Sequence, residues 1–119
     1  MMHSQFRIRM KGELGRQLPN FRERVGLRPC GRLSDDWDEE FGRLELRSRE
    51  QGWVNLSLWR YSDDDWLVKL TYEKDPLPAA EAEQLRRRVL DAAEEAGMTV
   101  TAQSGTEPSK PGLAEGFSN

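Results

Sequence analysis

The sequence has one histidine and one cysteine among its 119 residues, and it contains no long apolar run. The lone histidine, His3, lies near the N-terminus, so histidine-based acid and base chemistry and zinc sites are hard to build. The single Cys30 excludes an internal disulfide and agrees with a reducing compartment. No segment approaches the roughly 20 apolar residues that cross a bilayer. We therefore expect a cytoplasmic protein that neither spans nor binds a membrane.

Motifs for metal and phosphate chemistry are missing as well. A calcium loop starting at Asp36 would place Phe41 where the pattern needs glycine and Arg47 where it needs a bidentate glutamate. The aspartates at 63–65 fit a solvated turn better than an ion site. There is no glycine-rich phosphate loop and no internal repeat. We expect no catalytic residues, no metal and no cofactor, and hence a protein that is not an enzyme.

Length and composition predict one small domain followed by a tail. A chain of 119 residues can bury one hydrophobic core. From about residue 103 the sequence loses its periodicity and becomes rich in Ser, Gly and Pro, so that this part cannot bury enough apolar surface to offset its ordering entropy. We expect residues 1–103 to form a single α+β domain and residues 104–119 to be a flexible C-terminal tail.

Alternation of apolar and polar residues predicts the strands, because successive side chains of a strand point to opposite faces. This pattern covers residues 5–11, 43–49, 53–61, 66–73 and 98–102. Helical spacing predicts a short helix over 19–25, ended by Gly26, and a longer helix after Pro76 that Gly97 ends. Residues 27–40 are expected to form a loop.

The element order predicts a two-layer α+β sandwich with a mostly antiparallel five-stranded sheet and two helices on one face. It resembles a ferredoxin-like split βαβ arrangement with one additional strand, and such folds host many unrelated functions. The predicted core comprises Phe6, Ile8, Met10, Phe21, Val25, Leu44, Leu46, Val54, Leu56, Leu58, Val68, Leu70, Leu85, Val89 and Val100.

The same alternation predicts an open sheet face that is basic and aromatic. Its expected residues are Arg7, Arg9, Arg43, Arg47, Trp53, Trp59 and Lys69. A single-stranded nucleic acid would stack its bases on the tryptophans and place its phosphates at the arginines. The net charge of −3 argues against a general polyanion binder, so we keep this function as the alternative.

An acidic stretch of the predicted loop supports the function that we favour. It consists of Asp35, Asp36, Trp37, Asp38, Glu39 and Glu40. Acidic loops steer basic partners, and an exposed indole, Trp37 or Trp59, anchors them. We therefore predict a small bacterial protein-binding domain of inhibitor, immunity or antitoxin type, whose partner is a basic toxin or enzyme. Both a monomer and a homodimer joined through the open sheet faces fit this prediction.

Overall fold

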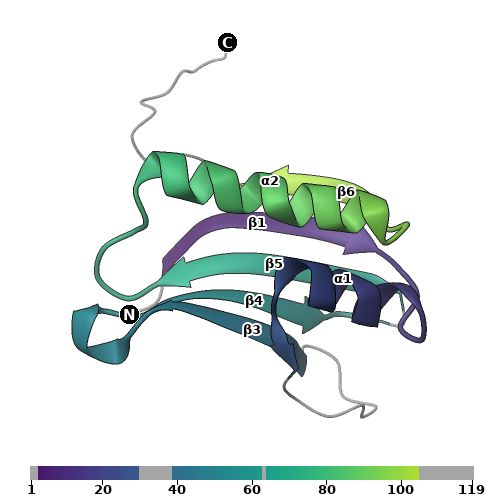
Figure 1. Ribbon diagram of the computed structural model, residues 1–119, viewed down its shortest axis with the longest axis horizontal. Coiled ribbons are helices and arrows are strands. Elements are labelled where there is room, and N and C mark those ends of the chain that lie inside the picture. The colour runs from purple at the N-terminus through teal and green to yellow at the C-terminus, as the bar shows by residue number, and fades with distance from the viewer. Residues whose placement is uncertain (1–2, 30–38, 63, 105–119) are drawn as a thin grey trace.

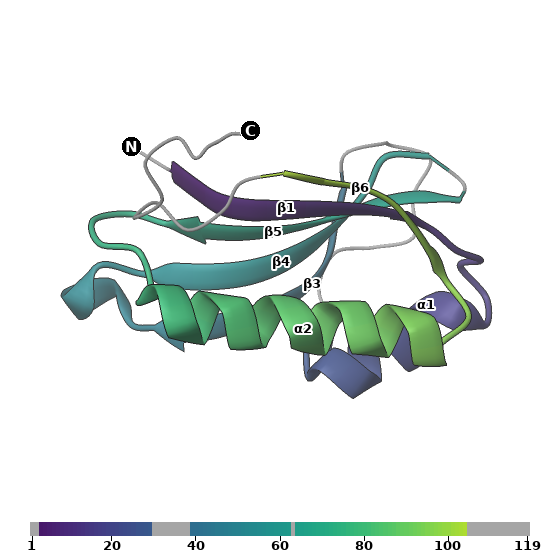
Figure 2. The ribbon, with the colours of Figure 1, turned by 90° about the horizontal axis from the view of Figure 1, so that it is seen from above.

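The computed structural model describes residues 3–29, 39–62 and 64–104 and has two layers, a sheet and a pair of helices (Figure 1). Six strands form an antiparallel sheet in the order β2-β3-β4-β5-β1-β6. Both helices lie on one side of this sheet, as Figure 2 shows. The predicted α+β class is confirmed, although the sheet has six strands rather than five. No helix in the described ranges is long and apolar enough to cross a membrane.

The elements follow the predicted order with one addition. They are β1 (His3–Lys11), α1 (Gln17–Val25), β2 (Arg28–Pro29), β3 (Glu39–Arg47), a 3₁₀ turn (Arg49–Gln51), β4 (Val54–Arg60), β5 (Asp65–Tyr72), α2 (Ala79–Glu95) and β6 (Thr99–Ser104). Because β5 and β6 both pair antiparallel with β1, they are parallel to each other, and β5-α2-β6 is a split βαβ unit. The part of the predicted tail from residue 105 onward lies outside the described residues.

The additional strand, β2, occupies a segment that we expected to be loop. Arg28 pairs with Arg43 of β3, and Pro29 pairs with Gly42. Proline lacks a backbone N–H and is therefore confined to edge strands, where β2 lies. Gly42 leaves room for this edge, because a Cβ at its position would lie 3.2 Å from the Cβ of Leu27.

The core lies between the sheet and the helices. Its largest fully buried side chain is Trp66, whose Nε1 donates a hydrogen bond to the carbonyl of Gly12 at 3.1 Å. Most of the predicted core is buried, whereas Leu44 and Val100 are half-buried. Leu46 was predicted to be buried and is 37% exposed, because it lies at an irregularity near the end of β3.

Candidate binding surface on the open sheet face

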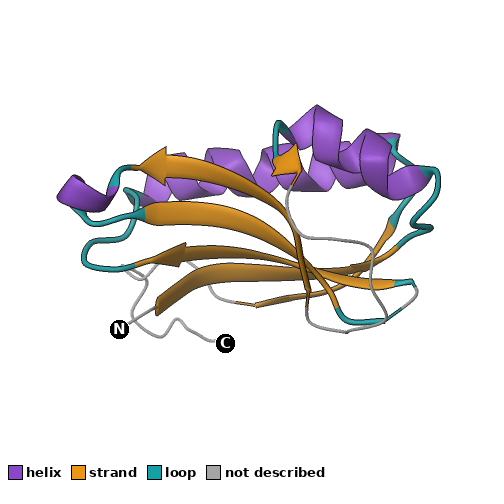
Figure 3. Cartoon of the chain, turned by 90° about the horizontal axis from the view of Figure 1, so that it is seen from below, coloured by secondary structure: helices purple, strands orange, loops and turns teal. Residues whose placement is uncertain are grey.

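The face of the sheet opposite the helices carries a row of basic side chains. Figure 3 shows both helices on one side of the strands and none of the described helices on the other. Directly opposite residues of antiparallel strands share a face, so the strand register identifies the row. It consists of Arg28, Arg43, Ser57, Lys69, Arg7 and Ser104, one residue from each strand in the order β2 to β6. We call this row the basic rung.

Tryptophans lie on both sides of the basic rung along β4. Trp59 follows Ser57 by two residues, and Trp53 precedes β4 on the other side. Both indoles are half-buried, and together they line a shallow depression of about 200 Å³. Lys69 Nζ lies 4.7 Å from the centre of the Trp59 ring, and Trp59 Nε1 donates to Ser57 Oγ at 3.0 Å. The depression therefore combines aromatic surface with charges of both signs, because Glu40 lines it as well as Arg43 and Lys69.

The floor of this depression contains an unused acceptor. Asn55 Oδ1 is buried and accepts no hydrogen bond from the described residues. Asn55 lines the depression beside Thr71, whose Oγ1 donates to the backbone carbonyl of Asn55 at 3.4 Å. A buried acceptor without a donor is costly, so a bound donor would be favoured here.

Two of the arginines on this face form bidentate ion pairs. Arg43 donates to both carboxylate oxygens of Glu40, at 2.6 and 2.7 Å, and Arg9 donates to both oxygens of Asp65, at 2.6 and 3.1 Å. The hydrogen bonds from Arg9 hold the pKa of Asp65 below its usual range, although partial burial acts in the opposite direction. The charges of Arg9 and Arg43 are thus compensated locally.

Arg7 and Arg28 differ from these two arginines. Within the described ranges, neither side chain has a hydrogen bond or an ion pair with another residue. Arg7 lies opposite Lys69, and Arg28 lies opposite Arg43, so each faces another cation across the strands. Like charges in directly opposite positions are destabilising.

The structure brings together six of the seven residues predicted for this face. Arg7, Arg9, Arg43, Trp53, Trp59 and Lys69 lie on it. Arg47 does not, because a bulge shifts the register of β3 between Glu45 and Arg47. Arg47 lies opposite the core residue Val54, and its Nη1 donates to the Asp75 carbonyl at 3.0 Å. Its predicted place on the open face was therefore wrong.

A second bulge in β3 joins part of the acidic stretch to this face. Phe41 is the extra residue between the pairs Glu40–Trp59 and Gly42–Leu58. Because of this bulge, Glu40 and Arg43 share the open face and form their ion pair. Of the other predicted acidic-loop residues, Asp35, Asp36, Trp37 and Asp38 lie outside the described residues, and Glu39 is the first residue of β3.

Sequence reasoning missed Arg28 as a member of the basic rung. Its segment was read as loop because a two-residue strand that contains proline has no periodicity to detect. Ser57 and Ser104 were missed too, since serine has no charge or ring to single it out. Only the pairing of β2 with β3 places Arg28 beside Arg43.

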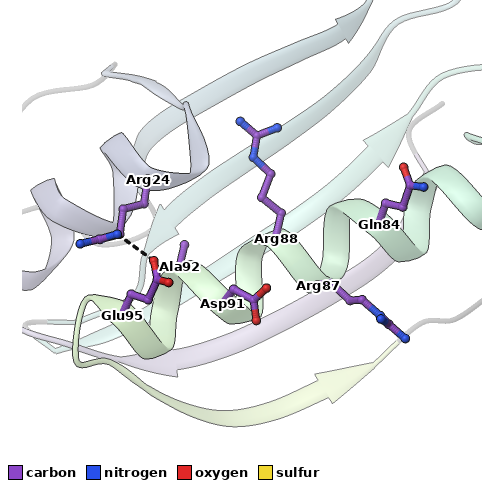
Figure 4. A pocket seen from close by; sticks show the side chains of 7 residues that line it. All are labelled: Arg24, Gln84, Arg87, Arg88, Asp91, Ala92 and Glu95. Atoms are coloured by element: carbon purple, nitrogen blue, oxygen red, sulfur yellow. Dashed lines mark hydrogen bonds and ion pairs between the residues drawn. The ribbon is translucent and has the colours of Figure 1, made fainter.

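A larger concavity lies on the opposite layer, between α1 and α2, with a volume of about 490 Å³ (Figure 4). Figure 4 shows the ion pair between Arg24 and Glu95 at one end, 2.7 Å long, and Arg88 extending from α2 toward the strands. Arg87 points away on the other side of the helix. The charged residues that line the concavity are of both signs: Arg24 of α1, and Arg87, Arg88, Asp91 and Glu95 of α2. This concavity contains none of the predicted site residues.

The described residues contain no group of three or more His, Cys, Asp or Glu side chains that could hold a metal ion. No known protein family, curated protein or solved structure matches the chain.

Proposed function

We propose that the chain is a non-enzymatic protein-binding domain of inhibitor or immunity type. Its acidic stretch, residues 35–40, would meet a basic surface on a toxin or enzyme. The neighbouring indole of Trp59 would supply the aromatic anchor. Electrostatic attraction between the two surfaces would accelerate the encounter and select the partner.

One observation carries this proposal: Glu40, the last residue of the acidic stretch, lies opposite Trp59 on the open face. Glu40 and a half-buried tryptophan are therefore neighbours, although 18 residues lie between Glu40 and Trp59 in the sequence. The acidic β4–β5 connection lies at the same end of the sheet. It leads into Asp65, the first residue of β5, which pairs with Lys11, the last residue of β1. Glu40, Asp65 and Trp59 thus lie at one end of the sheet, which supports the proposal.

A homodimer through the open faces is less well supported. Packed sheets bury alternating apolar side chains between them. The open face instead presents the basic rung together with Glu40 and Glu45, so it lacks the alternating apolar side chains of a packed sheet. A heterologous partner with its own charge pattern fits this face better.

Charge reversal of the acidic stretch tests the proposal. The full chain would be cross-linked in cells of its native host, and the captured proteins would be identified by mass spectrometry. We expect the triple variant Asp36→Lys, Asp38→Lys and Glu39→Lys to lose a basic protein that the wild type captures. We also expect the purified wild type to inhibit the activity of that captured protein and the triple variant to lose this inhibition.

A matched control reverses three exposed acids of α2, with the changes Glu81→Lys, Asp91→Lys and Glu94→Lys. The control makes the same change in net charge on the opposite layer and should keep both capture and inhibition. If the control loses the captured protein as completely as the acidic-stretch variant does, net charge rather than the acidic stretch governs binding, and the assigned surface is wrong.

A further inference from the structure

We propose that the depression between Trp53 and Trp59 binds one ring of a neutral carbohydrate. The depression lies on the open face and has a volume of about 200 Å³. The apolar C–H face of the sugar ring would lie on the indole of Trp53, and the hydroxyl groups of the sugar would contact the polar side chains beside it. The proposal goes beyond the proposed function and is independent of it, because Trp53 and Asn55, which carry it, do not belong to the acidic stretch.

The charges around the depression favour a neutral ligand. Arg43 donates to both carboxylate oxygens of Glu40, and Lys69 Nζ lies over an indole ring, so both cations have partners. Glu45 lies two residues beyond Arg43 on the same face of β3. An anionic ligand, such as a phosphate of a nucleic acid, would meet Glu40 and Glu45, whereas a cationic ligand would compete with Arg43 and meet Lys69. A neutral ligand avoids these repulsions and the cost of desolvating a charge.

Trp53 supplies an apolar platform for such a ligand. Its indole is half-buried, so the protein holds one part of the side chain while another part remains accessible. The ring of Trp59 is less suitable, because Lys69 Nζ lies 4.7 Å from its centre. The C–H groups on one face of a sugar ring bury apolar surface against an indole and make weak contacts with its electron-rich face. Trp53 therefore matches the apolar side of a sugar.

Hydrogen-bonding side chains lie in a row across the strands next to Trp53. The strand register gives this row as Glu45 of β3, Asn55 of β4, Thr71 of β5 and Ser4 of β1. It contains a carboxylate, an amide and two hydroxyl groups, and hence both donors and acceptors. A sugar hydroxyl group both donates and accepts, so it can pair with each of them. The row therefore matches the polar rim of a sugar.

Asn55 has an acceptor that is still available for a ligand. Its Oδ1 is buried and accepts no hydrogen bond from the described residues. The terminal torsion of an asparagine side chain is soft, so a rotation of the amide would bring Oδ1 to the floor of the depression. A sugar hydroxyl group that donates to this oxygen would remove the cost of an unsatisfied acceptor. An apolar ligand could not do so.

The two sides of the site indicate which sugar to test. A ring whose hydroxyl groups are all equatorial has flat C–H faces, and its hydroxyl groups point outward along the rim. β-Linked glucose has this geometry. Cellotetraose, an uncharged chain of β-1,4-linked glucose, is therefore the probe, with one ring in the depression and its neighbours over the open face.

NMR of the indole N–H groups tests the proposal, in a titration of the ¹⁵N-labelled full chain with cellotetraose. We expect the Trp53 signal to shift and saturate with a Kd of about 1 mM, as for a ligand that buries a single ring. The signal of Trp66, which is fully buried in the core, should not move. A change from about 50 to about 500 mM NaCl should alter Kd less than about twofold, because no charge pair forms.

Substitutions locate the site, with the Trp59 signal as the readout in the variants of Trp53. Trp53→Ala should weaken binding about fivefold or more, and Trp53→Phe should weaken it less, because a smaller aromatic platform remains. Asn55→Ala should weaken binding about threefold or more through the lost acceptor. The control is Tyr61→Ala, which removes a half-buried aromatic ring from the same face outside this depression and should bind like the wild type.

The backbone amide spectrum shows whether each variant is folded. If Trp53→Ala does not fold, Trp53→Phe and Asn55→Ala still decide whether the depression is the site. Unchanged binding in both folded variants would contradict the assignment.

Three further results would overturn the proposal. The first is no shift of the Trp53 signal at about 50 mM cellotetraose, far above the expected Kd. The second is an equal loss of binding in Tyr61→Ala. The third is equally tight binding of thymine, a neutral planar base without hydroxyl groups, which would identify an aromatic ring as the ligand. None of these experiments changes the acidic stretch, so they leave the proposed protein-binding function to its own test.

Discussion

At the residue scale, Asp65 links the open face to the pH dependence of stability. Arg9 lowers the pKa of this carboxyl in the folded state relative to the unfolded chain. The resulting stabilisation is present above the unfolded pKa of about 3.9 and is lost as the pH falls through the folded pKa. We therefore expect Asp65→Asn to lower the free energy of unfolding at pH 7, and we expect its difference from the wild type to shrink as the pH falls below about 3.9. Urea titrations across this range measure the difference.

Asp64 provides the comparison for Asp65. Its carboxylate is 62% exposed and lies 3.8 Å from Lys11 Nζ. Exposed pairs of this kind contribute about 0 to 1 kcal/mol, so Asp64→Asn should change stability little at any pH. Equal effects of the two substitutions would mean that the bidentate geometry of the Arg9–Asp65 pair adds no stability.

At the element scale, the junction of α1, β2 and β3 depends on Gly42. Arg22 of α1 donates from Nη1 to the Phe41 carbonyl at 3.0 Å, and its guanidinium lies 4.7 Å from the centre of the Phe41 ring. A Cβ at position 42 would lie 3.1 Å from Arg22 Cδ and 3.2 Å from Leu27 Cβ. We expect Gly42→Ala to destabilise the protein by about 1 to 2 kcal/mol, because the packed neighbours must move. Chemical denaturation gives this value.

Gly15 is the matched control for this substitution. A Cβ at Gly15 would meet no atom within 4 Å. Gly15→Ala should therefore leave stability unchanged or raise it by up to about 1 kcal/mol, since alanine restricts the unfolded chain. Hydrogen exchange should also show weaker protection at the β2–β3 pairing in Gly42→Ala alone. If both alanines behave alike, Gly42 is not needed for the close approach of β2.

At the scale of the whole molecule, the described core ends before the tail. The last residue that packs against it is the half-buried Val100 of β6. The composition of the tail predicts that it contributes no core, so deletion of residues 105–119 should change Tm by less than about 2 °C. Differential scanning calorimetry of the truncated chain tests this expectation.

A longer truncation supplies the contrast. Removal of residues 99–119 also removes β6, which pairs with five residues of β1, and exposes that edge of the sheet. We expect a large fall in Tm or a failure to fold. An equal loss in the shorter truncation would contradict the predicted boundary near residue 103.

The sequence by itself determined the α+β class and the two faces of the central strands. In β1 the period of two assigns Phe6, Ile8 and Met10 to the core and Arg7 and Arg9 to the open face, as the structure has them. This works because side-chain alternation is a local property of an extended backbone, and the burial of one face preserves it.

Only the tertiary structure decided the face of Arg47 and the membership of Arg28 in the basic rung. A bulge adds one residue to a strand and shifts the side of everything beyond it, and the alternating sequence around Leu46 does not mark where that happens. Strand β2 forms by pairing with Gly42 and Arg43 of the neighbouring strand β3. Arg28 meets Arg43, and Arg7 meets Lys69, through pairings between distant parts of the chain, and local periodicity contains no information about such partners.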